Sequence, residues 1–178
     1  MRAMRQLLVI LVCALAAVPA ALAGPSSSGD GVLELKAVYG KVAIGKPLQP
    51  ARGLLWGQMD SGKLIVQDPI IGDGKILVTG WDSRVFSPAS DIDGTPAQTT
   101  YTGTNIHFRV TGGKYRLIFK GSGIDLTAIG AGVALLNASE NAIDPGYYAV
   151  DSGDWISAPL FVTKAVSFGT PTPPPPTP

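Results

Sequence analysis

The sequence predicts an all-β fold, either an antiparallel β-sandwich or a small barrel, built as a single domain. Short runs of alternating apolar and polar residues recur along the chain, and Gly- and Pro-rich turns separate them at intervals of roughly 8–12 residues. The 22 glycines and 15 prolines suit a chain with many turns. No stretch carries the 3.6-residue period of an amphipathic helix of about ten or more residues.

Residues 1–23 predict a secretory signal peptide. Arg2 and Arg5 precede an uncharged apolar run, and Ala21-Leu22-Ala23 fits the small-x-small cleavage pattern, so we expect cleavage before Gly24. The apolar run is short for a bilayer span and contains a proline, so no transmembrane span is expected after cleavage. These features predict a protein that is secreted or held in the periplasm or cell envelope. Residues 24–31 then form a flexible N-terminus ahead of a domain over residues 32–168.

The chain has one cysteine, Cys13, which lies inside the predicted signal peptide. The mature protein would therefore have no disulfide, no thiol nucleophile and no cysteine metal site, and an apolar core alone would hold it together. The whole chain carries 14 basic and 13 acidic residues. Removal of Arg2 and Arg5 leaves it close to neutral, which argues against nucleic acid as a partner.

Four runs in the first half predict strands, and turn residues separate them. Asp60-Ser61-Gly62 lies between two of these runs, and Lys46 to Pro50 forms a turn or edge segment because proline cannot donate to a central ladder. Residues 83–100 hold two prolines and Gly94, and we expect a long loop or an irregular edge there. The four predicted strands span residues 32–39, 54–59, 63–67 and 75–81.

Residues 104–120, TNIHFRVTGGKYRLIFK, predict a β-hairpin around Gly112-Gly113, because a Gly-Gly pair supplies the positive φ angles of a two-residue turn. That register would place Val110 opposite Tyr115, and Arg109 opposite Arg116. One face of the hairpin would be apolar and the other polar. The expected apolar face consists of Ile106, Phe108, Val110, Tyr115, Leu117 and Phe119.

The last third of the chain predicts further strands. Residues 123–137 read as a strand in which Gly130 and Gly132 mark a bulge, although one helical turn over residues 125–129 stays open. After a turn at residues 141–146, closing strands are expected at 147–150 and 155–162. Residues 169–178, GTPTPPPPTP, predict a polyproline II tail that cannot join the core.

Catalytic, metal and cofactor sites are not indicated by any motif. His107 is the single histidine, no G-x-S-x-G nucleophile elbow occurs, and a histidine zinc site would lack further ligands. Calcium stays open, because Asp91 and Asp93 and the turn from Asp151 to Asp154 supply oxygen ligands, but Asp-Gly is also ordinary turn chemistry. Asn137 begins a glycosylation sequon, which matters only in a glycosylating host.

Two surface features are candidate binding sites. The polar face of the predicted hairpin gathers basic residues, which suit an anionic envelope polymer. A solvated sheet face is the simpler reading of the same residues. The candidate anion-binding residues are His107, Arg109, Lys114, Arg116 and Lys120. The second feature is a set of turn-adjacent tryptophans, Trp56, Trp81 and Trp155, which stack on sugar rings if exposed and plug the core if buried.

These observations favour an exported, non-catalytic β-domain that acts as an envelope-associated or secreted binding or structural module. The alternative is a carbohydrate-binding module or a carbohydrate-acting enzyme that uses aspartates and the tryptophans. A glycoside hydrolase needs two carboxyl groups at catalytic separation, which the sequence alone neither supports nor excludes.

Overall fold

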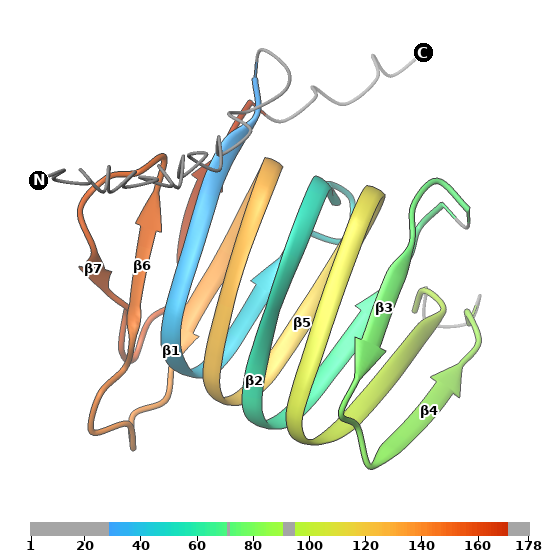
Figure 1. Cartoon of the computed structure of the whole chain (residues 1–178), viewed down its shortest axis with the longest axis horizontal. Helices are drawn as coiled ribbons and strands as arrows, with labels where there is room; N and C mark the ends of the chain where they lie inside the picture. Colours follow the sequence, from blue (N-terminus) through green and yellow to red (C-terminus); the bar gives the residue numbers. More distant parts are fainter. Residues whose placement is uncertain (1–28, 71, 91–94, 171–178) are drawn as a thin grey trace, which may run out of the picture.

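The computed structural model describes residues 29–70, 72–90 and 95–170, and within them the chain is one all-β domain without a helix (Figure 1). The prediction of an all-β, antiparallel single domain is confirmed. The predicted signal peptide and residues 171–178 of the Pro-rich tail lie outside the described residues. The strands are β1 (Gly31–Ile44), β2 (Ala51–Gln67), β3 (Ile76–Thr79), β4 (Ser83–Ser87), β5 (Gln98–Ala138), β6 (Tyr147–Val150), β7 (Ile156–Ser157) and β8 (Lys164–Phe168).

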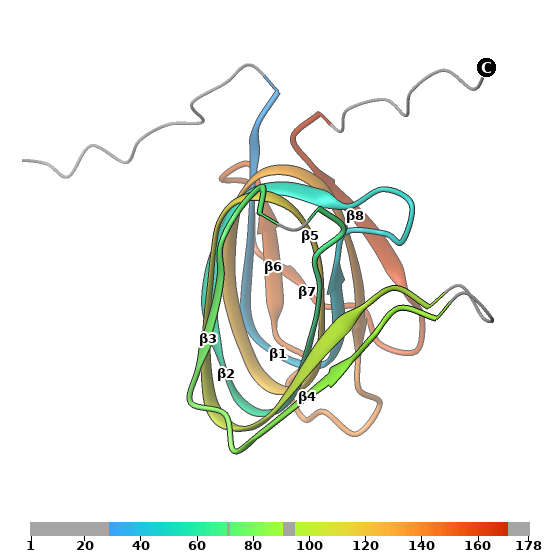
Figure 2. The same ribbon diagram turned by 90° about the vertical axis from the view of Figure 1, so that its right-hand side faces the viewer.

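Strands β1, β2 and β5 wind around a common axis as a flattened coil (Figures 1 and 2). β2 lies between two successive turns of β5, because Gly62 pairs with both Gly103 and Gly121. Residue numbers in β5 fall as those in β2 rise, from Ala51 opposite Tyr115 to Val66 opposite Thr99, so the pairing is antiparallel. β5 therefore winds back through the spaces between the turns that β1 and β2 make.

β1 repeats this arrangement at the other end of the coil. It pairs with the middle turn of β5, from Gly31 opposite Gly130 to Ile44 opposite Leu117, and Ile44 also pairs with Ala134 in the last turn. Short antiparallel strands extend the sheet: β3, β4 and β8 pair with β5, β6 pairs with β1, and β7 pairs with β6.

The coil has two walls, and we name them by their residues. The front wall, which faces the viewer in Figure 1, contains residues 31–38, 54–59, 106–111 and 124–130, with β3 paired to it. The back wall contains residues 41–44, 63–67, 98–102, 115–120 and 132–138, with β4 and β8 paired to it. Alternation along each strand sends every second side chain into the space between the walls.

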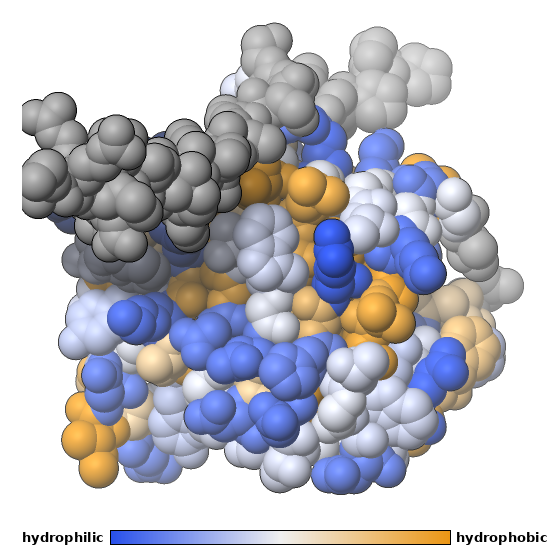
Figure 3. All heavy atoms as spheres, viewed as in Figure 1, coloured by the Kyte–Doolittle hydropathy of each residue, from blue (hydrophilic) through white to orange (hydrophobic). Residues whose placement is uncertain are grey.

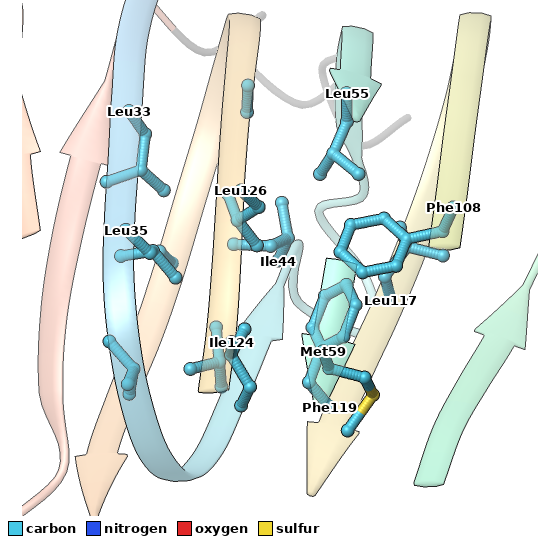
Figure 4. Packing of buried hydrophobic residues seen from close by; sticks show 14 of the residues in the cluster. Leu33, Leu35, Ile44, Leu55, Met59, Phe108, Leu117, Phe119, Ile124 and Leu126 are labelled. Carbon is cyan, nitrogen blue, oxygen red and sulfur yellow. The ribbon is translucent and has the colours of Figure 1, made fainter. Parts of the chain in front are cut away.

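That interior is an apolar core (Figure 4). The six residues of the predicted apolar face are all buried, at 0–3% exposure. Phe108 of the front wall meets Phe119 of the back wall with ring centroids 4.8 Å apart and a tilt of 48°. Burial of this kind stabilises the fold by about 25 cal/mol per Å² of apolar surface, which is the main contribution available to a domain without disulfides.

The predicted hairpin pairing is wrong, although its alternation is right. Gly112 and Gly113 have the expected positive φ, at +85° and +79°, but they form a bend between the two walls and not a tight hairpin turn. Val110 pairs with Leu55, and Tyr115 pairs with Ala51. The two runs therefore contact each other through their side chains across the core, because β2 satisfies the backbone groups that a hairpin would have paired.

Other boundaries also differ from the prediction. The two strands expected on either side of Asp60-Ser61-Gly62 are one strand, β2. Residues 83–100, expected as a loop or irregular edge, contain β4 and the start of β5, and residues 125–129 are strand and not helix. The closing strand lies at β8, whereas the segment expected at 155–162 holds only the short β7.

Glycines line the bends between the walls, where neighbouring backbones approach closely. At one bend Gly40, Gly121, Gly62 and Gly103 pair in a row across adjacent strands. A Cβ atom on Gly121 would lie 1.9 Å from the carbonyl oxygen of Ser61, and one on Gly62 would lie 2.2 Å from that of Lys120. Larger residues cannot occupy these positions unless the strands separate.

Substitutions at three glycines distinguish two reasons for glycine, which are a positive φ and a close approach of neighbouring backbone. Gly112 needs a positive φ but has open space around it, Gly57 needs space alone, with Asp125 O at 2.1 Å, and Gly62 needs both. We expect Gly112→Ala to cost about 1–2 kcal/mol of unfolding free energy, the usual cost of left-handed backbone. Gly57→Ala and Gly62→Ala should cost more in urea unfolding, and equal losses at all three would contradict this account of the close backbone approaches.

Two buried tyrosines predict opposite effects of losing a hydroxyl. Tyr115 is fully buried, its hydroxyl has no hydrogen-bond partner among the described residues, and burial raises the pKa of that hydroxyl. The hydroxyl of Tyr148, which is also buried, accepts a hydrogen bond from Lys164 Nζ. We expect Tyr115→Phe to raise the free energy of unfolding by about 1 kcal/mol and Tyr148→Phe to lower it. Thermal unfolding checks both, and destabilisation by Tyr115→Phe would contradict the first.

Candidate functional site

A groove of about 850 Å³ lies on the outer face of the front wall. Two tryptophans that the sequence suggests for carbohydrate binding, Trp56 and Trp155, both line it. They come from distant parts of the chain, Trp56 from β2 and Trp155 from the segment between β6 and β7. The polar residues of the groove are Glu34, Lys36, Gln58, Arg109, Asp125 and Thr127.

The register of the sheet sets the floor of the groove. Glu34 of β1 pairs with Thr127, Thr127 with Trp56, and Trp56 with Arg109. Leu77 of β3 continues the same line beyond Arg109. Because directly paired residues share a face, these five side chains form one row across the outer surface of the front wall.

Apolar and polar side chains are mixed on this face. Trp56 is 42% exposed, Leu54 45% and Trp155 50%, so each offers a large apolar surface to solvent. Figure 3 shows apolar side chains gathered in the upper part of the face, with hydrophilic side chains below them. An open apolar surface with convergent polar groups is typical of a ligand-binding site.

A bulge in β1 brings Asp125 into the groove wall. β1 advances from Leu35 to Val38 while β5 moves only from Leu126 to Ile124, and Ala37 in the bulge has a φ of +52°. The Ala37 amide donates a hydrogen bond to Asp125 Oδ1 over 2.8 Å. Asp125 therefore holds the backbone at the bulge through one carboxylate oxygen, and the other oxygen makes no hydrogen bond with the residues that the structure describes.

Trp81, the third predicted tryptophan, lies outside the groove. It is 42% exposed, and its ring lies 6.1 Å from that of Tyr101. All three tryptophans are thus partly exposed, and the alternative that they plug the core does not hold.

The five residues of the predicted anion site are spread over the molecule. His107 and Arg109 belong to the front wall, where Arg109 lines the groove. Arg116 and Lys120 belong to the back wall, so Arg109 does not lie opposite Arg116 as expected. The Lys114 amide donates to Asp73 Oδ2 over 2.9 Å near the Gly112-Gly113 bend.

Arg116 takes part in a side-chain network on the back wall. Its Nη1 donates to Gln67 Oε1 over 2.7 Å, and Gln67 Nε2 donates to Gln98 Oε1 over 3.0 Å. Its Nε has no partner among the described residues, and partial burial lowers the pKa of the guanidinium. The network thus joins Arg116, Gln67 and Gln98.

Two carboxyl groups, those of Glu34 and Asp125, line the groove. In the described part of the chain no group of three or more potential metal ligands occurs. Asp91 and Asp93 fall outside that part, and Asp151 Oδ1 accepts a hydrogen bond from the Val32 amide over 2.8 Å. The pKa of Asp68 is raised, mainly by burial, but this carboxyl lines a separate small depression with Arg116.

Comparison of the chain with protein-family models, with curated proteins and with solved structures finds no match. Among the residues described, no helix has the length and apolar character that a membrane crossing requires.

Sequence reasoning missed Glu34, Lys36, Gln58, Asp125 and Thr127 as groove residues. Each is a polar residue at an outward position of a strand, so alternation alone gives its face but not its neighbours. The groove exists because strands distant in sequence pair in one register, and that register depends on contacts between turns of the coil.

Proposed function

We propose that this chain is an exported, non-catalytic binding module whose front-wall groove takes a carbohydrate. The observation that carries the proposal is the meeting of Trp56 and Trp155, both about half-exposed, in one open groove. The signal-peptide pattern of residues 1–23 supports export.

The apolar part of the groove suits the faces of sugar rings. An indole ring offers a flat apolar surface on which the C–H face of a sugar can stack, and it loses little conformational entropy on binding. Leu54 extends this surface beside Trp56, since both are outward residues of β2.

The polar part of the groove suits sugar hydroxyls. Glu34, Asp125 and Gln58 supply acceptors, and Lys36 and Arg109 supply donors. Hydroxyl groups both donate and accept, so a mixed set of this kind can satisfy them without a strong net charge. The module therefore fits a neutral or weakly charged saccharide best.

The tryptophans give the decisive test. We expect Trp56→Ala and Trp155→Ala each to weaken binding to a soluble polysaccharide by about 10–100-fold, the range for a central aromatic contact. Trp81→Ala is the matched control, since Trp81 has the same 42% exposure as Trp56 but lies outside the groove. Affinity electrophoresis against a β-glucan, a xylan and a mannan measures these changes.

Absence of binding by the wild-type protein to every polysaccharide in the panel would contradict the proposal. Equal losses in all three tryptophan variants would show that the effect is general destabilisation and not loss of stacking. Circular dichroism of each variant separates these outcomes.

A carbohydrate-acting enzyme remains the second candidate, because Glu34 and Asp125 both line the groove. A hydrolase would need one of them as acid and the other as base or nucleophile. We expect the wild-type protein to release no reducing ends from a bound polysaccharide, and Glu34→Gln to keep affinity within about threefold. Release of reducing ends that Glu34→Gln abolishes would replace the binding module with an enzyme.

A further inference from the structure

Three lysines form a row on the outer face of the back wall. Lys120 of β5 pairs with Lys41 of β1 on one side and with Lys63 of β2 on the other. All three are exposed, and directly paired residues share a face of the sheet, so the side chains project together into solvent. Neighbouring strands lie about 4.8 Å apart, so the three lysines follow one another across the strands at about that backbone spacing.

Repulsion among the three lysines lowers the stability of the fold, and no ion pair within the described residues offsets it. Like charges directly opposite each other on paired strands are destabilising. None of the three lysines makes an ion pair or a side-chain hydrogen bond with the residues that the structure describes. The ion pair found among those residues joins Arg52 to Asp30. The next outward positions along the strands carry no carboxylate either. They are Ser61, Ser122 and Tyr39 on one side, and Ile65, Ile118 and Ala43 on the other.

Protection of a sheet edge does not explain the row. Lysines often discourage edge-to-edge association, but they do so on edge strands. Lys120 lies on a turn of β5 that has β1 on one side and β2 on the other. The strand that carries Lys63 is likewise enclosed, between two turns of β5.

We propose that the lysine row, Lys41, Lys120 and Lys63, binds a linear acidic polysaccharide that lies across the strands. A row of three exposed lysines on successive strands matches a chain with repeated anionic groups better than a single small anion. Ile118 and Ala43, the next outward residues along two of these strands, are only 9% and 3% exposed, so the lysines supply the contacts that this face offers.

This inference is independent of the front-wall groove. The lysine row lies on the other wall, beyond the bend formed by Gly40, Gly121 and Gly62. Lys120 is the one member that the sequence also suggests as an anion ligand. Its neighbours in the row come from strands whose pairing the sequence does not reveal.

Polygalacturonate, a linear polymer of uronic acid, is the probe for the test. We expect the Lys41→Gln/Lys63→Gln/Lys120→Gln variant to bind it at least about tenfold more weakly at low salt. The slope of log affinity against log salt concentration should fall by up to about 3, one for each charge contact removed. The control is Lys46→Gln/Lys75→Gln/Lys114→Gln, which changes the net charge equally but at other sites.

Equal weakening in both triple variants would overturn the proposal, because net charge and not the row would then decide binding. Wild-type protein that fails to bind polygalacturonate would also overturn it. Binding to vesicles containing phosphatidylglycerol but not to polygalacturonate would replace the polysaccharide with a membrane surface. The Lys41→Gln/Lys63→Gln/Lys120→Gln variant should keep wild-type affinity for the neutral polysaccharides that test the groove, so failure of the groove proposal and failure of this one are distinguishable.

Discussion

Close approach of backbones at the two bends is the constraint on which the coil depends. Successive turns can form a continuous hydrogen-bonded sheet only if the strands stay in register as they pass from one wall to the other. Gly53 and Gly62 in β2 pair with Gly130 and Gly121 in β5, so the same short separation between glycines recurs on both strands. The front-wall segments of both strands lie between these glycines, and Phe108 and Phe119 pack between the two walls.

Much of the local structure is predictable from the sequence, and little of the pairing is. The alternation around Phe108 and Leu117 identifies the buried side chains, because it depends only on neighbouring residues. The partners of those strands do not follow from alternation, since a Gly-Gly pair with positive φ suits a hairpin and a bend equally well. The recurrence of glycines in β2 and β5 is a signal in the sequence that favours the coil.

The candidate sites also divide into residues that the sequence identifies and residues that only the strand pairing reveals. The sequence singles out Trp56, Trp81 and Trp155 because exposed tryptophans beside turns can stack on sugar rings, and two of the three, Trp56 and Trp155, line the groove. It gives no reason to group Glu34 with Trp56, or Lys41 with Lys63, since each of these pairs is linked through an intervening turn of β5. A surface site on such a coil takes its residues from neighbouring strands, and those residues are therefore far apart in the sequence.

The interleaving of β5 between β1 and β2 has a consequence for when the chain can fold. β1 and β2 do not pair with each other, because a turn of β5 separates them. A chain that has been synthesised only as far as β4 therefore lacks the hydrogen-bonding partner of both strands. Contacts that join residues so distant in sequence also form slowly. The N-terminal half can therefore complete its sheet only after β5 has been synthesised.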